Sequence, residues 1–151
     1  MRSLAICLLV TWLSGVAADK TVVKVPSWPD SPLYSHAVVS GGMVYVSGAI
    51  GINMTVVSGG GSDPKLCTGG LAGETVCALS AIATVLKAAG TTMDNLVDCT
   101  VFLGSTPDFA VLNAAWATVF KSDPPARAAL GGHELTLSAS VEIKCIATLA
   151  A

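Results

Sequence analysis

Short apolar runs separated by glycine, proline and polar residues dominate this chain, and runs of this kind predict β-strands. The clearest pair flanks Gly41 and Gly42, which suit the tight turn of a hairpin. Later runs alternate apolar and polar residues, as strands with one buried face do. The strands expected on this basis lie at about residues 22–25, 37–39, 43–50, 55–57 and 96–103, with two more on either side of Gly131–Gly132.

Two segments carry the apolar spacing of helices that cover a core with one face. The first spans residues 71–89 and ends before Gly90, which is placed to cap it. The second begins at Thr106-Pro107-Asp108, which offers an N-cap, a proline at the first helical position and an acid near the positive dipole end. The predicted stripes are Val76, Leu79, Ala83 and Leu86, and then Phe109, Leu112, Trp116, Val119 and Phe120.

The order strands, helix, strand, helix, strands predicts an α+β domain with both helices on one face of the sheet. At 151 residues the chain is long enough for one such core and short for two. With 52% hydrophobic and 12% charged residues, it would leave the second sheet face as an exposed apolar patch. Oligomerisation is the simplest way to cover that face.

Residues 1–18 have the pattern of a secretory signal peptide, with Met1-Arg2 as the positive region, residues 3–16 as the apolar region and cleavage after Ala18. An uncleaved membrane anchor is the alternative, although the apolar run is shorter than the roughly 20 residues of a spanning helix. Residues 19–33 then form a polar lead-in, and residues 34–151 form the domain. No membrane contact is expected after cleavage.

Charge and cysteine usage narrow the possible functions. The formal net charge is −2 and no basic stripe is present, which argues against nucleic acid as a partner. No CxxC or Cys/His cluster occurs, so no metal site is expected.

The sequon Asn53-Met54-Thr55 would be a surface glycosylation site in a secreted protein. Signal removal leaves four cysteines, with three possible pairings, at Cys67, Cys77, Cys99 and Cys145.

Candidate chemistry is concentrated in residues 124–147, which hold Arg127 and, after it, Glu142. Pro124-Pro125 restrict the backbone that leads into Arg127, so its guanidinium could be presented to an anion at low entropic cost. Glu142 could orient a water molecule or pair with that arginine. An ordinary ion pair beside the sheet is the alternative.

Several motifs together resemble the RidA/YjgF family of reactive-intermediate (enamine/imine) deaminases. The matching stretches follow the family order from about Tyr34 to Ala147, and DF…N followed by PPAR and VEI is the specific part. The six matching stretches are LYSHAV at 33–38, VYVSGAIG at 44–51, TVFL at 100–103, DFAVLN at 108–113, PPAR at 124–127 and VEIKCIA at 141–147.

The resemblance implies a chorismate-mutase-like single domain, with a six-stranded mixed sheet and two helices on one face. It also implies a homotrimer whose sheets make a barrel-like core and whose active sites lie in clefts between subunits. Such a trimer would cover the second sheet face.

The resemblance also assigns roles to individual residues. Arg127 matches the arginine that grips the substrate carboxylate, and Glu142 matches the acid associated with the attacking water. Substrate contacts are implied for Tyr34, Ser47, Asn113 and the backbone carbonyl of Ala129. A packing role remains the alternative for Tyr34, and a structural role for Ser47 and Asn113.

This chain departs from the family pattern near the site. The family's usual residues at these positions are proline, glutamine, serine-cysteine and a second glutamate. Here they are Leu33, Ala49, Ala128-Ala129 and Lys144. The changes bear on substrate range more than on the reaction, because a backbone carbonyl is retained at Ala129.

The activity implied is cofactor-free hydrolysis of 2-enamine and 2-imine acids, such as 2-aminoacrylate, to 2-oxo acids and ammonia. A secreted module that binds small acids or another protein, without turnover, is the alternative on the same scaffold. A nuclease is the least favoured, because no basic or aromatic-lined groove is apparent.

Neighbouring strands in the family sheet imply a Cys99–Cys145 bridge, which leaves Cys67 to pair with Cys77. Unpaired buried cysteines are the alternative. The signal peptide predicts the secretory pathway and secretion, with delivery to an organelle or vacuole as a variant.

Overall fold

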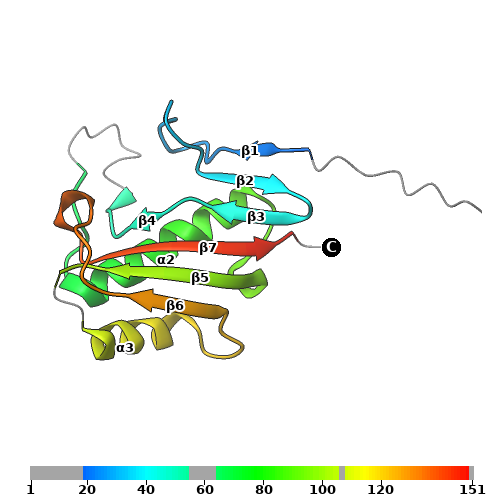
Figure 1. The fold of residues 1–151 in the computed structure, drawn as a ribbon. Coiled ribbons are helices and arrows are strands. Elements are labelled where there is room, and N and C mark those ends of the chain that lie inside the picture. Colours follow the sequence, from blue (N-terminus) through cyan, green and yellow to red (C-terminus); the bar gives the residue numbers. More distant parts are fainter. Residues whose placement is uncertain (1–18, 55–63, 106–107, 150–151) are drawn as a thin grey trace, which may run out of the picture.

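The computed structural model describes residues 19–54, 64–105 and 108–149, which form one mixed sheet and two helices (Figure 1). The expected strand at 55–57 and the signal sequence lie outside these residues. The helices are α2 (Gly70–Ala88) and α3 (Phe109–Val119). The strands are β1 (Thr21–Val23), β2 (Ala37–Ser40), β3 (Met43–Val46), β4 (Ala49–Ile50), β5 (Leu96–Leu103), β6 (Ala126–Leu130) and β7 (Val141–Thr148).

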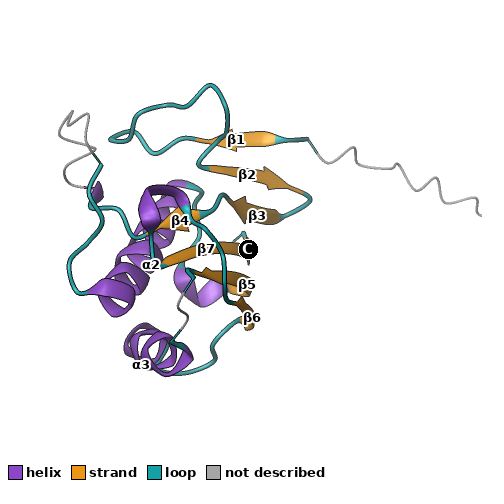
Figure 2. Cartoon of the chain, turned by 60° about the vertical axis from the view of Figure 1, so that its left-hand side comes forward, coloured by secondary structure: helices purple, strands orange, loops and turns teal. Residues whose placement is uncertain are grey.

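The strand order is β1-β2-β3-β7-β5-β6, and β4 also pairs with β7. β5 and β6 run parallel, whereas the other pairs are antiparallel. Figure 2 shows both helices on the same side of this sheet. The predicted α+β class and the placement of the helices are therefore confirmed.

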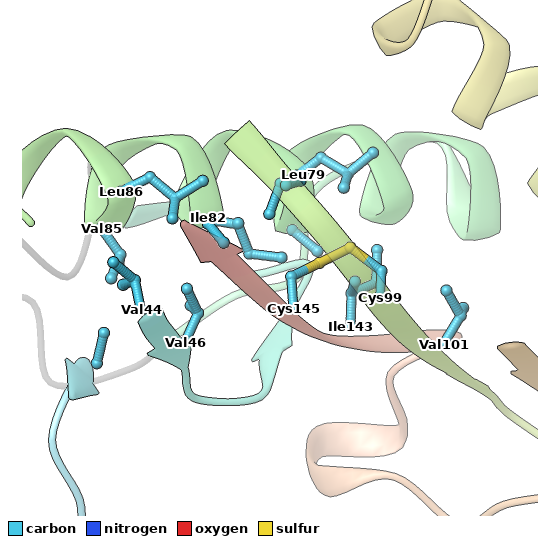
Figure 3. Close-up of a cluster of buried hydrophobic side chains, with 14 of the residues drawn as sticks. Val44, Val46, Leu79, Ile82, Val85, Leu86, Cys99, Val101, Ile143 and Cys145 are labelled. Atoms are coloured by element: carbon cyan, nitrogen blue, oxygen red, sulfur yellow. A yellow bond between two sulfur atoms is a disulfide. The ribbon is translucent and has the colours of Figure 1, made fainter. Parts of the chain in front are cut away.

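The core lies between α2 and the central strands (Figure 3). Alternate residues of β5 and β7 are fully buried beneath the helices, as their apolar alternation predicts. The labelled core side chains are Val44, Val46, Leu79, Ile82, Val85, Leu86, Cys99, Val101, Ile143 and Cys145.

The predicted stripe of α2 is partly wrong. Val76 is 42% exposed and Ala83 is half-buried, because the buried face is centred on Ile82. The predicted end is correct. Gly90 has φ 84° and donates its N–H to Lys87 O, which closes the helix in a Schellman arrangement. By length and composition alone α2 could cross a membrane, but its Ile82 face packs on the sheet.

The start of α3 differs from the prediction. Asp108 is the N-cap, and its carboxylate accepts hydrogen bonds from the N–H groups of Ala110 and Val111. Thr106 and Pro107 lie outside the described residues. Phe109, the first residue of the helix, is 45% exposed rather than part of the core.

The single strand predicted for residues 43–50 is two strands, β3 and β4, separated by Ser47 and Gly48. The N–H of Ser47 donates to His36 O at 3.1 Å, which continues the β2–β3 register, and its hydroxyl donates to Ser35 O at 2.7 Å. Both β3 and β4 nevertheless pair with β7, so the chain changes direction at the interruption and stays in the sheet.

Two disulfides are present, in the pairing implied by the resemblance. Cys99 and Cys145 are direct cross-strand partners on β5 and β7, with Cα atoms 4.1 Å apart. Cys67 reaches Cys77 on α2 across a Cα separation of 6.5 Å. The first bridge is buried, and the second is half-buried beside the N-terminus of α2.

Candidate active site

Arg127 lies on β6, at the edge of the sheet, with its side chain on the helix side. Its register partner on β5 is Cys99, which is buried beneath the helices. Arg127 Nη2 donates to Asn113 Oδ1 at 2.7 Å, and its Cζ atom lies 4.8 Å from the centroid of the Trp116 ring. An amide and an aromatic face from α3 therefore orient an exposed guanidinium.

No carboxylate among the described residues forms an ion pair with this guanidinium. Among residues 19–54, 64–105 and 108–149, the only ion pair is that between Lys24 and Asp30. The expectation that Glu142 could pair with Arg127 is wrong for a single chain, because the two side chains point to opposite faces of the sheet. The donors of Arg127 that do not contact Asn113 are thus available to an anion.

Glu142 lies on the face of β7 that points away from the helices, between the buried residues Val141 and Ile143. Its register partners are Phe102 on β5 and Ile50 on β4. A Cβ atom placed on Gly48 would lie 2.0 Å from Glu142 Oε1. The carboxylate therefore rests against the break between β3 and β4, and only glycine leaves room for it there.

Tyr34 and Ser47 line one small cavity, with Lys20, Ser31 and Ser35 among its other walls. Tyr34 is 62% exposed, so it does not pack into the core of a single chain. Ser47 does have a structural role, because its hydroxyl donates to Ser35 O. Ser47 also directly precedes Gly48, the residue against which the Glu142 carboxylate rests.

The predicted site residues therefore form two groups. Asn113 and Ala129 lie with Arg127 on the helix side, and Ala129 follows Arg127 by two residues on the same strand. Tyr34 and Ser47 line one cavity, and Ser47 directly precedes Gly48, against which the Glu142 carboxylate rests. One chain holds an anion-binding half and a carboxylate half, and it does not bring them together.

Sequence reasoning missed two contributors to these halves. Trp116 was expected only in the core, and it is 6% exposed, yet it also supports the Arg127 guanidinium. Its spacing of three residues from Asn113 on one helix face was a usable signal. Gly48 was read as an ordinary strand residue, although glycine inside a strand often marks a bulge or a close approach.

The chain is similar to known proteins over most of its length. Residues 29–149 match the family model described as "Endoribonuclease L-PSP". The "RutC family protein UK114" of Drosophila melanogaster is 38% identical over 114 residues, which cover 76% of this chain and 78% of that protein. The "2-iminobutanoate/2-iminopropanoate deaminase" of Rattus norvegicus has the same identity and coverage.

Solved structures give the same match at the level of the fold. A Yersinia pestis protein described as belonging to the conserved Rid family is 31% identical, with a TM-score of 0.76 over 87% of this chain and all of its own. RidA from an Antarctic Psychrobacter is 27% identical, with a TM-score of 0.73 over 85% of this chain and 99% of its own.

Proposed function

Because this chain belongs to the RidA/YjgF family, we propose that it hydrolyses reactive 2-enamine and 2-imine acids, such as 2-aminoacrylate, to 2-oxo acids and ammonia. The observation that carries the proposal is the Arg127 guanidinium. It is oriented by Asn113 and Trp116 and has no carboxylate partner among the described residues. This arrangement is suited to the carboxylate that every such substrate carries.

The chemistry needs little beyond orientation. Arg127 holds the substrate carboxylate, and a water molecule adds to the imine carbon of the tautomer to form a carbinolamine. Collapse of that adduct forms the C=O bond of the 2-oxo acid as the C–N bond breaks and ammonia leaves. Glu142 would orient the water or accept its proton.

Two halves on opposite faces of one sheet require a second copy of the chain. We infer a homotrimer in which the anion-binding half of one subunit meets the carboxylate half of the next. Support comes from the sheet face away from the helices, where Val22, Tyr45 and Leu130 are each more than 40% exposed. Packing of these faces into a barrel-like core would bury them.

The family description names an endoribonuclease, but this chain has little to bind a phosphate backbone. Its formal net charge is −2, and Arg127 is held for a planar anion rather than being part of a basic stripe. We therefore propose the deaminase reaction and not RNA cleavage.

We further propose that the protein enters the secretory pathway and is secreted, with organelle or vacuolar delivery as the variant. Two disulfides fit an oxidising compartment. Asn53 is exposed, which fits the proposed glycosylation of a secreted protein at this position.

The direct test follows the loss of 2-aminoacrylate, generated by a coupled enzyme, with and without the protein. Wild-type protein should accelerate the loss, and Arg127→Ala should abolish the acceleration while light scattering still gives about three chain masses. Arg127→Lys keeps the charge without the planar fork and is the matched control, expected to retain partial activity. Wild-type protein that binds 2-oxo acids without accelerating the loss would favour the binding module instead.

A further inference from the structure

Glu74 is a buried acid that the proposed reaction does not use. It is 4% exposed on α2, and both of its oxygens accept hydrogen bonds from one residue. Glu74 Oε2 accepts from the Ser140 backbone N–H at 2.7 Å, and Oε1 accepts from the Ser140 hydroxyl at 2.9 Å. A buried carboxylate is costly unless it is bonded in this way, so the pair joins the helix layer to the sheet at one defined point.

That point is the start of β7. Ser140 immediately precedes the strand, and Glu142 is the second residue of the strand. The Ser140 carbonyl accepts a hydrogen bond from the Gly104 N–H at 2.9 Å. The N–H, hydroxyl and carbonyl of Ser140 are therefore all engaged, two residues before the candidate catalytic carboxylate.

Glu74 also touches the chain on the other side of Glu142. A Cβ atom on Gly51 would lie 2.5 Å from both Glu74 Cα and Glu74 Cβ, so the two backbones are in close contact. Gly51 directly follows Ile50, the β4 residue paired with Glu142. The β7 and β4 segments that flank Glu142 thus both rest on this one helical residue.

The segment before Ser140 includes two residues in a strained backbone conformation. Leu137 and Ser138 have φ values of 59° and 54°, in the left-handed region that residues other than glycine disfavour. Such a backbone persists only where its surroundings fix it. Two backbone hydrogen bonds restrain the turn from within, from Ser138 N–H to Leu135 O at 3.1 Å and from Ala139 N–H to Thr136 O at 3.2 Å. The Glu74–Ser140 hydrogen bonds restrain its end.

We propose that Glu74 is a positioning residue of the active site, which fixes the start of β7 through Ser140 and thereby fixes the Glu142 carboxylate. This inference rests on the deaminase function proposed above. It predicts that the hydrogen-bond acceptors at position 74, rather than the volume of the side chain, set the turnover rate.

Steady-state kinetics of the full trimer with 2-aminoacrylate test this. Glu74→Ala should lower kcat by about 10- to 100-fold through misplacement of Glu142. KM should stay within about twofold, because Arg127 still holds the substrate carboxylate. Glu74→Gln keeps one acceptor for the Ser140 N–H and should restore most of kcat. Ser140→Ala removes only the hydroxyl bond and should give an intermediate loss.

Thr75→Val is the matched control. Thr75 is the next residue of α2, is fully buried and donates its hydroxyl only to Leu71 O of its own helix. Its replacement perturbs α2 without touching Ser140, so kcat should stay near the wild-type value.

Two results would overturn the proposal. Wild-type kcat in Glu74→Ala, with the reaction itself intact, refutes the positioning role and leaves the deaminase function standing.

If wild-type protein shows no turnover, the deaminase function fails, and amide hydrogen exchange then tests whether Glu74 anchors the start of β7. The amides of residues 140–143 should exchange at least about tenfold faster in Glu74→Ala and Ser140→Ala, and those of 145–148 should not change. Equal exchange at 140–143 refutes the anchor. If Glu74→Ala does not fold, Ser140→Ala carries the same comparison.

Discussion

Gly48→Ala should remove activity while leaving the fold intact. The new methyl carbon would lie 2.0 Å from Glu142 Oε1, whereas real contacts of this kind are almost never shorter than 3.0 Å. The oxygen must therefore retreat by about 1 Å, and a displacement of that size in a catalytic group costs about 100-fold in rate.

Stability should change little in this variant, for two reasons. The clashing atom is the end of a flexible side chain, which can rotate away. Gly48 is also not among the glycines with positive φ, so alanine can adopt its backbone conformation. Alanine restricts the unfolded chain as well, which favours folding by about 0.4–1 kcal/mol and offsets part of the strain.

The assay compares kcat/KM with 2-aminoacrylate and the melting temperature of the same preparation. Gly51→Ala is the contrasting variant, because its methyl carbon would meet the backbone of Glu74 at 2.5–2.6 Å, and a helix backbone cannot rotate away. Gly51→Ala should melt much earlier. Wild-type activity in Gly48→Ala would show that the position of the Glu142 carboxylate does not matter to the reaction, and would refute the role given to Glu142.

Two further predictions concern stability and the disulfides. Asp108→Ala removes the acceptor for the N–H groups of Ala110 and Val111. It should lower the free energy of unfolding by about 1 kcal/mol, measured by urea unfolding. An unchanged free energy of unfolding would mean that α3 does not need its cap. Mild reductant followed by alkylation of the native protein should label Cys67 and Cys77 but not Cys99 and Cys145. The last two are 0% and 1% exposed, and thiol–disulfide exchange requires access to the sulfur. Labelling of all four cysteines at equal rates would contradict the burial of the Cys99–Cys145 bridge.

The strands were predictable where alternation was strict. Ile143 lies between Glu142 and Lys144, so its orientation toward the helices follows from sequence alone. The orientation of α2 was harder to predict, because small and apolar residues occur nearly all round it. Val76 therefore looked as suitable for the core as Ile82 does, and only the tertiary packing separates them.

The candidate site was predictable as a set of residues and not as an arrangement. The resemblance supplied Arg127, Asn113 and Glu142 individually. The contact between Arg127 and Asn113 depends on how α3 packs beside β6, which no local pattern encodes. The alternation of apolar and polar residues along β5 and β7 could place Glu142 on the sheet face opposite the core. The face of the sheet on which the Arg127 side chain lies could be assigned only from the pairing of Arg127 with Cys99 in the structure.

Mixing two inactive variants tests the central claim, a site shared between copies of the chain. Arg127→Ala and Glu142→Ala should each be inactive alone. When they are unfolded, mixed equally and refolded together, sites that take Arg127 from one subunit and Glu142 from its neighbour become intact. Random trimers should then recover about a quarter of wild-type activity. A mixture no more active than its two parents, although light scattering and tagged pull-down confirm mixed trimers, would show that the two halves do not meet between subunits.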